Sequence, residues 1–139
     1  VAATVANKGE QMTPYLVSRI LDPDLNEVSS TSTKVARTPI DSATASSLSS
    51  LMQTAVAEGT GTSAQVSGVQ VAGKTGTAET GTDSGPTTWF VGFAGTDINK
   101  PEIALAVVLD GNAETEDGAT GGKVAGPVAA AVIDAAVNQ

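Results

Sequence analysis

Three β-rich segments follow one another between residues 69 and 110, and they constrain the fold more than any other feature of the sequence. They are residues 69–78, 87–95 and 102–110, and a turn containing Asn99, Lys100 and Pro101 joins the last two. Helical patterns stand before and after this block. Three consecutive strands with flanking helices predict an antiparallel sheet covered by helices, which is an α+β architecture.

Helices are predicted at three places in the chain. Residues 1–8 look helical and end at Gly9, a suitable C′ residue. Pro39 and Asp41 announce a helix that runs to Gly59. Its apolar stripe consists of Leu48, Leu51, Met52, Ala55 and Val56. The last helix covers roughly residues 123–137, and its predicted buried positions are Val124, Val128, Val132 and Ala135.

The remaining segments carry weaker signals. Residues 12–21 are β-rich and reach a turn at Asp22-Pro23-Asp24, and the polar residues 26–38 predict a loop with at most a short strand. Residues 59–65 are expected to be a flexible connector, residues 80–86 a loop, and residues 111–122 an acidic, Gly-rich loop. Trp89 and Phe93 share one face of their strand and are expected in the core.

Composition excludes several classes of function. The 139 residues make one domain at most, with 40% hydrophobic residues. A formal charge of −8 and only 3% aromatic residues disfavour nucleic acid as a partner. The chain has no Cys and no His, so it holds no thiolate nucleophile, no Ser-His-Asp triad and no histidine-ligated metal site. No metal and no cofactor is expected.

The segment SGVQVAGKTGTAE, residues 67–79, allows two incompatible interpretations. From Gly68 to Thr75 it matches the phosphate-binding pattern G-x-x-x-x-G-K-T. That loop needs a buried strand before the first Gly and a helix that begins at the Lys-Thr pair. TSAQVS is a poor buried strand, and the residues after Thr75 are glycines and β-branched threonines instead of helix formers. The context therefore disfavours nucleotide binding.

On a strand, the same residues suit a different ligand. Thr75 and Thr77 share one face, and Gly76 removes a side chain between them, so a ligand backbone can lie close to the strand. Lys74 adds a cation. An edge strand also offers free N–H and C=O groups to an extended peptide. The pattern indicates a site for a peptide that ends in a carboxylate.

KTGTAE, residues 74–79, resembles the third active-site motif of the penicillin-binding proteins, especially the class B high-molecular-mass transpeptidases of mycobacterial type. The resemblance covers the whole chain in the right order. It includes ANKGEQMTPYLV at 6–17, the helix at 41–58 that ends in EGTG, WFVGFAG at 89–95 and GGKVAGPVAAAVI at 121–133.

The resemblance implies a mechanism and partners. A serine would attack the D-Ala-D-Ala amide of a peptidoglycan stem peptide, form an acyl-enzyme and pass the acyl group to a neighbouring stem. β-Lactams would mimic that dipeptide. Lys74 would supply positive potential, the hydroxyls of Thr75 and Thr77 would hold the substrate carboxylate, and the Thr77 N–H would be one of two oxyanion-hole donors. Gly76 would keep the strand open to the acyl chain.

Two motifs of that family are absent from the chain. S-x-x-K is imitated only by residues 31–34, TSTK, in a polar loop, and no Ser occurs two residues before an Asn. The chain also opens on VAATVANKG, like the tail of a helix already under way. We therefore expect residues 1–139 to be the C-terminal portion of one transpeptidase domain, inactive alone and completed by an N-terminal half that carries the nucleophilic serine. The protein would lie on the extracytoplasmic face of the membrane, anchored upstream.

Two alternatives stay open from the sequence. A D,D-carboxypeptidase or a serine β-lactamase shares the K-T-G motif, although the flanking WFVGFAG favours a transpeptidase. A non-catalytic binding domain that has lost its nucleophile is the alternative of another class.

Overall fold

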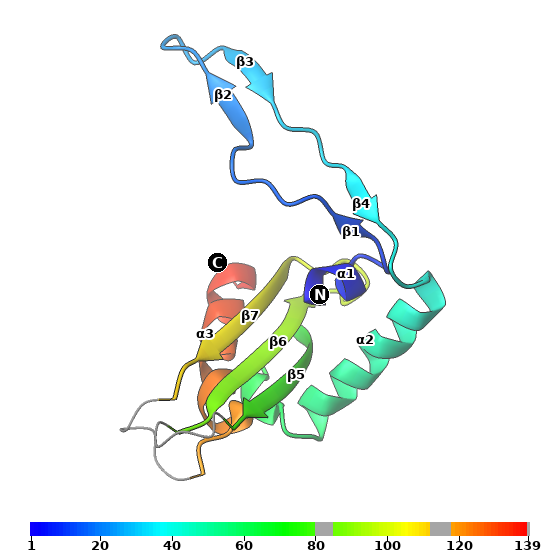
Figure 1. The fold of residues 1–139 in the computed structure, drawn as a ribbon, viewed down its shortest axis with the longest axis vertical. Helices are drawn as coiled ribbons and strands as arrows, with labels where there is room; N and C mark the ends of the chain where they lie inside the picture. Colours follow the sequence, from blue (N-terminus) through cyan, green and yellow to red (C-terminus); the bar gives the residue numbers. More distant parts are fainter. Residues whose placement is uncertain (80–84, 112–117, 139) are drawn as a thin grey trace.

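The computed structural model describes residues 1–79, 85–111 and 118–138. A three-stranded antiparallel sheet forms its centre, with the order β5 (Gln70–Ala78), β6 (Thr87–Gly95) and β7 (Ile103–Leu109) (Figure 1). The register places Lys74 opposite Val91 and Gly76 opposite Trp89. The predicted α+β architecture with three consecutive antiparallel strands is confirmed.

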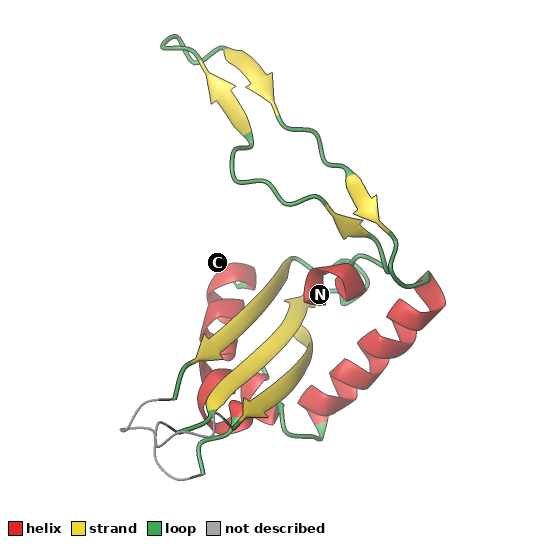
Figure 2. Ribbon diagram, in the orientation of Figure 1, coloured by secondary structure: helices red, strands yellow, loops and turns green. Residues whose placement is uncertain are grey.

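Two helices, α1 (Ala2–Ala6) and α2 (Ser42–Ala57), lie against one face of this sheet and leave part of it uncovered (Figure 2). The core on this side consists of Val5, Ala72 and Phe93, with Met52 and Ile40 packed against them. α2 begins where predicted, because the Asp41 side chain caps it by accepting a hydrogen bond of 2.6 Å from the Thr44 N–H.

The opposite face packs against the C-terminal helix. The chain enters through a π-helical turn, η2 (Gly121–Ala125), and continues as α3 (Gly126–Val137) beside the short 3-10 helix η1 (Thr62–Ala64). Contacts join α3 to β6, β7 and η1. The buried residues of this larger core are Val56, Ala64, Val71, Phe90, Ala94, Ala125, Ala129 and Ile133.

The predicted packing is partly wrong in three elements, α3, α2 and β6. On α3, Val128 and Val132 are each 42% exposed, and the buried residues are Gly126, Ala129 and Ile133. Gly126 and Ala129 let the helix approach the sheet closely, and Val128 and Val132 lie outside this buried stripe. On α2, Val56 is buried but Leu51 is 67% exposed. In β6, Phe93 is buried as expected whereas Trp89 is 39% exposed, and the buried Phe90 on the opposite face was not predicted.

Residues 59–65 are not the flexible connector that their composition predicts. Gly61, whose N–H donates to the Ala55 carbonyl, and Ala64 are both buried, and Gln65 donates from its side chain to the Val56 carbonyl. The segment is thus fixed to the end of α2. Most of the two other predicted loops, residues 80–84 and 112–117, lies outside the described residues.

Residues 11–37 form an arm that projects away from the sheet and its helices (Figure 1). Its base pairs β1 (Gln11–Met12) with β4 (Val35–Arg37), and its tip pairs β2 (Arg19–Leu21) with β3 (Glu27–Ser30). The prediction of a loop with at most a short strand at 26–38 is therefore wrong, because two strands lie there. The predicted turn is present, since the Asp22 carboxylate accepts hydrogen bonds from the backbone of Asp24 and Asn26.

Within the described residues, no helix has the length and apolar character needed to cross a membrane.

Candidate active site on the edge of the sheet

The residues from Lys74 to Thr77 occupy the second half of β5. This strand pairs only with β6 in the part of the chain that the structure describes, so its other edge carries no partner strand there. Side chains alternate along a strand, and Ala72 belongs to the core beneath α1 and α2 while Val71 belongs to the core beneath α3. Lys74 and Gly76 therefore lie on the α2 face. Thr75 and Thr77 share one face, as predicted, and it is the α3 face.

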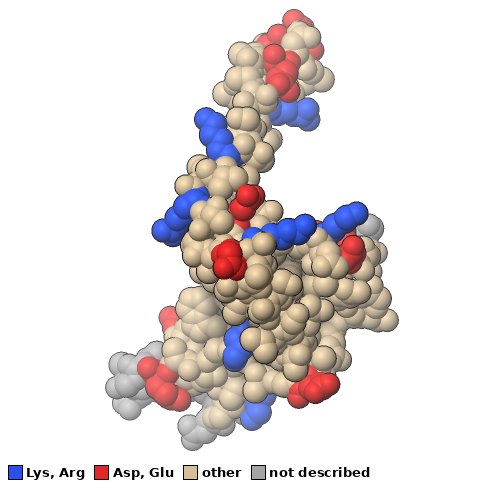
Figure 3. All heavy atoms as spheres, turned by 90° about the vertical axis from the view of Figure 1, so that its right-hand side faces the viewer, with Lys and Arg blue, Asp and Glu red and all other residues tan. Residues whose placement is uncertain are grey.

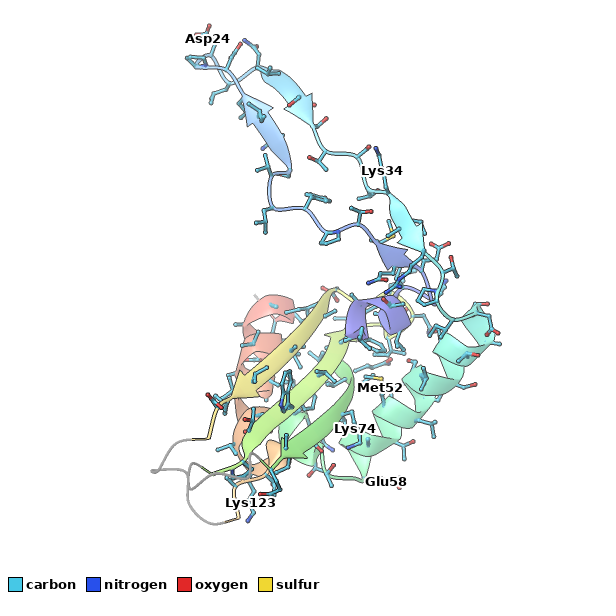
Figure 4. All side chains as sticks on the ribbon, viewed as in Figure 1. Asp24, Lys34, Met52, Glu58, Lys74 and Lys123 are labelled. Carbon is cyan, nitrogen blue, oxygen red and sulfur yellow. The ribbon has the colours of Figure 1, made fainter. Side chains whose placement is uncertain are left out.

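Lys74 extends beside α2, in the region of Met52 (Figure 4). Its side chain is exposed, and its ammonium donates a hydrogen bond of 2.7 Å to the Thr75 carbonyl. A carbonyl is a neutral partner, so this contact leaves the positive charge uncompensated. Lys74 also borders an apolar hollow of about 470 Å³ between α1, α2 and Val91 of β6. The Lys74 ammonium thus lies where the α2 face of the sheet meets the outer edge of β5.

Charges of both signs are scattered over the view in Figure 3, and most of that surface is uncharged. In this view, the described residues form no broad basic patch.

The hydroxyl of Thr75 already has one partner. It lies 2.6 Å from the Thr60 hydroxyl, and either oxygen can be the donor. Thr60 precedes η1 in the segment that leads from α2 to the strand. Sequence reasoning missed this residue, because the Gly-rich composition of 59–65 predicts a flexible connector.

The hydroxyl of Thr77 is held from the same side. It accepts a hydrogen bond of 3.2 Å from the Gly121 N–H, the first residue of η2. Gly121 has no room for a side chain, since an added Cβ would lie 2.5 Å from the Gly76 carbonyl oxygen. At Gly122 an added Cβ would overlap the Thr60 carbonyl. The glycine pair, which the sequence offered only as part of a resemblance, lets the start of the closing helix meet the site.

Gly76 is half-buried on the α2 face, where an added Cβ would lie 3.3 Å from the Cβ of Trp89. Because Gly76 has no side chain, nothing projects from this stretch of the edge beside the exposed ring of Trp89. Together, the four residues offer a cation on one face, two hydroxyls on the other, and between them an edge without a partner strand among the described residues. That arrangement can bind an extended peptide along the edge and a carboxylate at the threonines.

Other sequence candidates do not join this site. Lys34 lies on the arm, far from Lys74 (Figure 4), which agrees with the interpretation of residues 31–34 as a chance imitation of S-x-x-K. Lys74 and Thr75 stand inside a strand instead of opening a helix, so the phosphate-loop alternative has no structural basis.

Comparison with known proteins identifies the family. The family model of the penicillin-binding protein transpeptidase domain matches residues 1–134. Peptidoglycan D,D-transpeptidase PbpA of Mycolicibacterium smegmatis is 39% identical over 142 residues, which cover 100% of this chain and 28% of that protein. PbpA of Mycobacterium tuberculosis is 41% identical over 143 residues, with 99% and 28% covered.

Solved structures agree with the sequence comparison. The ceftriaxone acyl-enzyme complex of penicillin-binding protein A from M. tuberculosis superposes with a TM-score of 0.84 at 40% identity, over 97% of this chain and 30% of that one. The transpeptidase domain of FtsI4 from Legionella pneumophila gives a TM-score of 0.65 at 28% identity, over 94% and 41%. The chain thus spans under a third of the PbpA proteins that it matches. It belongs to the transpeptidase domain family of the penicillin-binding proteins.

Proposed function

We propose that this chain is the C-terminal part of a peptidoglycan D,D-transpeptidase that cross-links stem peptides and is acylated by β-lactams. The observation that carries the proposal is the K-T-G-T segment on the edge of β5 that has no partner strand among the described residues, with Lys74 on one face and the hydroxyls of Thr75 and Thr77 on the other. Relatives named peptidoglycan D,D-transpeptidase and structures of related proteins as ceftriaxone and penicillin G acyl-enzymes support it.

The reaction has two acyl-transfer steps. A serine oxygen attacks the amide between the two D-alanines of a stem peptide; an ester forms, the C–N bond breaks, and the terminal D-alanine leaves with a proton on its amine. The amine of a neighbouring stem then attacks the ester, forms a new amide and returns the proton to the serine. A β-lactam follows the first step only, because its amine stays attached to the acyl group.

Each residue of the strand segment has a role in this scheme. The Lys74 ammonium provides positive potential for proton movement at the nucleophile, and the Thr75 and Thr77 hydroxyls bind the carboxylate of the terminal D-alanine. The Thr77 N–H is one of two oxyanion-hole donors, a contribution of about 3 kcal/mol in comparable sites. Gly76 leaves room for the acyl chain at the edge.

The nucleophilic serine belongs to an upstream half of the same domain in this proposal. The apolar hollow beside Lys74 supports it, because the side chains that line it on α1 and α2 suit a packed partner segment. The same proposal puts the complete protein at the extracytoplasmic face of the membrane, held by a segment upstream of this chain. In this proposal, the chain alone supplies one of the two oxyanion-hole donors and lacks the nucleophilic serine.

Acylation kinetics of the complete protein test the role of Lys74. Lys74→Gln keeps a polar side chain, one atom shorter, and removes the charge, and we expect it to lower the acylation rate with benzylpenicillin by about a hundredfold or more. Lys100→Gln removes a charge from the turn between β6 and β7 and serves as the control. Equal rates for Lys74→Gln and the parent protein would exclude Lys74 from the reaction.

A further inference from the structure

Thr60 makes a side-chain contact that the proposed reaction does not yet use. Its hydroxyl lies 2.6 Å from that of Thr75, although the two residues are 15 positions apart. The distance is at the short end of the range for hydrogen bonds between hydroxyls. Thr60 comes from the segment after α2 and Thr75 from β5, so the tertiary fold creates this contact.

When a ligand carboxylate is bound, the number of hydroxyl protons decides which of the two threonines donates this hydrogen bond. A hydroxyl has one proton to donate and two lone pairs that accept. If the Thr75 hydroxyl donates its hydrogen bond to the carboxylate of a ligand, it cannot also donate to Thr60. The bond between the two threonines must then be donated by Thr60 and accepted by Thr75.

Thr77 has the same arrangement through a different donor. The Gly121 N–H, which can only donate, occupies a lone pair of the Thr77 oxygen. The Thr77 proton is thereby left for another acceptor. Both hydroxyls on this face thus have a neighbour able to donate to them, a backbone N–H behind Thr77 and the Thr60 side chain behind Thr75.

The position of Thr60 is fixed by its surroundings. The next residue, Gly61, donates its N–H to the Ala55 carbonyl at 3.0 Å. On the other side, Gly122 leaves no space for a Cβ against the Thr60 carbonyl. The Thr60 hydroxyl is therefore presented to Thr75 by the end of α2 and the start of η2, not by a free loop.

We propose that Thr60 is a positioning residue of the carboxylate site. Its hydroxyl donates to Thr75 and so directs the Thr75 proton to the carboxylate of the stem peptide or β-lactam. This inference rests on the proposed role of Thr75 in carboxylate binding. Hydrogen bonds to a charged acceptor are strengthened when the donor itself accepts a bond, so Thr60 acts on ligands that carry the carboxylate and not on those that lack it.

The test compares two ligands on the complete protein, benzylpenicillin and its methyl ester, in which the carboxylate charge is removed. The measured quantity is the ratio of their second-order acylation rate constants. Thr60→Val keeps the shape and removes the hydroxyl, and we expect it to lower the acid-to-ester ratio about tenfold. Thr60→Ser keeps the hydroxyl and is expected to stay within about twofold of the parent ratio.

Thr62→Val is the matched control, because Thr62 lies in the same turn with an exposed side chain; its ratio should not change. Thr75→Val distinguishes the positioning role of Thr60 from the carboxylate-binding role of Thr75. If Thr75→Val lowers the ratio and Thr60→Val does not, the role of Thr60 is overturned while the carboxylate role of Thr75 stands. If Thr75→Val leaves the ratio unchanged, Thr75 does not bind the carboxylate, and the proposed role of Thr60 fails with it.

A purely structural role for Thr60 gives a different result. In that case Thr60→Val would slow acylation by both ligands equally and leave the ratio unchanged, which overturns the proposal. Thermal unfolding of each variant checks that it is folded, and Thr60→Ala replaces the valine variant if the latter does not fold.

Discussion

At Gly121, a single hydrogen atom in place of a side chain decides how closely the closing helix meets the strand. An added Cβ would lie 2.5 Å from the Gly76 carbonyl oxygen and 3.0 Å from the Gly76 nitrogen. We expect Gly121→Ala to lower the free energy of unfolding by about 1–3 kcal/mol through overpacking. Urea unfolding of the complete protein measures it.

The matched control for this substitution is Ala131→Ser, which also adds one heavy atom but at an exposed position of α3. Its effect should stay within about 0.5 kcal/mol. A Gly121→Ala protein as stable as this control would mean that η2 and β5 are not in close contact in solution.

Thr88 carries the one buried side-chain oxygen without a hydrogen-bond partner among the described residues. It stands directly opposite Thr77 in the register of β5 and β6 and is 1% exposed. Thr88→Val replaces the hydroxyl by a methyl of similar size, so we expect unchanged stability or a gain of up to about 1 kcal/mol. Chemical denaturation checks this, and a clear loss of stability would show that the hydroxyl is satisfied in solution.

The start of α2 depends on a carboxylate whose pKa is shifted. The hydrogen bond from the Thr44 N–H lowers the pKa of Asp41 below its ordinary value of 3.8. A lowered folded-state pKa stabilises the protein at pH values above the unfolded pKa, and this contribution is lost as pH falls through the folded one. We therefore expect Asp41→Ala to lower the melting temperature at pH 7, and by less at pH 2.

Asp41→Asn is the control for the charge, because asparagine also caps helices. It should stay close to the parent protein at neutral pH and lose less stability than the parent below pH 4. The same melting-temperature difference between Asp41→Ala and the parent at pH 7 and pH 2 would contradict a role for the ionised carboxylate.

Elements with a strong periodic pattern were predictable from the sequence, and elements without one were not. The strands β5, β6 and β7 combine β-branched and aromatic residues with clear turn signals, so their bounds were predicted to within a residue or two. The short strands of the arm have two to four residues each, too few for a period to emerge. On α3 the valine pattern gave the wrong face, because Gly126, Ala129 and Ile133 are buried while Val128 and Val132 are exposed.

The same distinction applies to the site. Lys74, Thr75, Gly76 and Thr77 are consecutive, so alternation along a strand gives their faces directly. Thr60 and Gly121 reach the strand from two other segments through tertiary contacts. No local pattern in the sequence encodes a hydrogen bond between residues 15 or 44 positions apart.

For the molecule as a whole, the open face beside Lys74 predicts how the domain is completed. Leu51 on α2 is 67% exposed and lines the apolar hollow with α1. If the upstream half covers this hollow, Leu51→Asp would place a charge in a buried contact. We expect it to destabilise the complete protein by about 2 kcal/mol or more.

Ser50→Asp, at the neighbouring exposed position, is the control and should change stability by less than about 0.5 kcal/mol. Equal stability of both variants in urea unfolding would mean that the hollow stays open to solvent in the complete protein.

Intact-mass spectrometry with benzylpenicillin tests the central claim most directly. The complete protein and the isolated 139-residue chain are each incubated with the antibiotic, denatured and weighed. We predict one covalent penicillin on the complete protein, at a serine upstream of this chain, and none on the isolated chain. An adduct on the isolated chain, or no adduct on a folded complete protein, would contradict a penicillin-binding transpeptidase completed by the strand from Lys74 to Thr77.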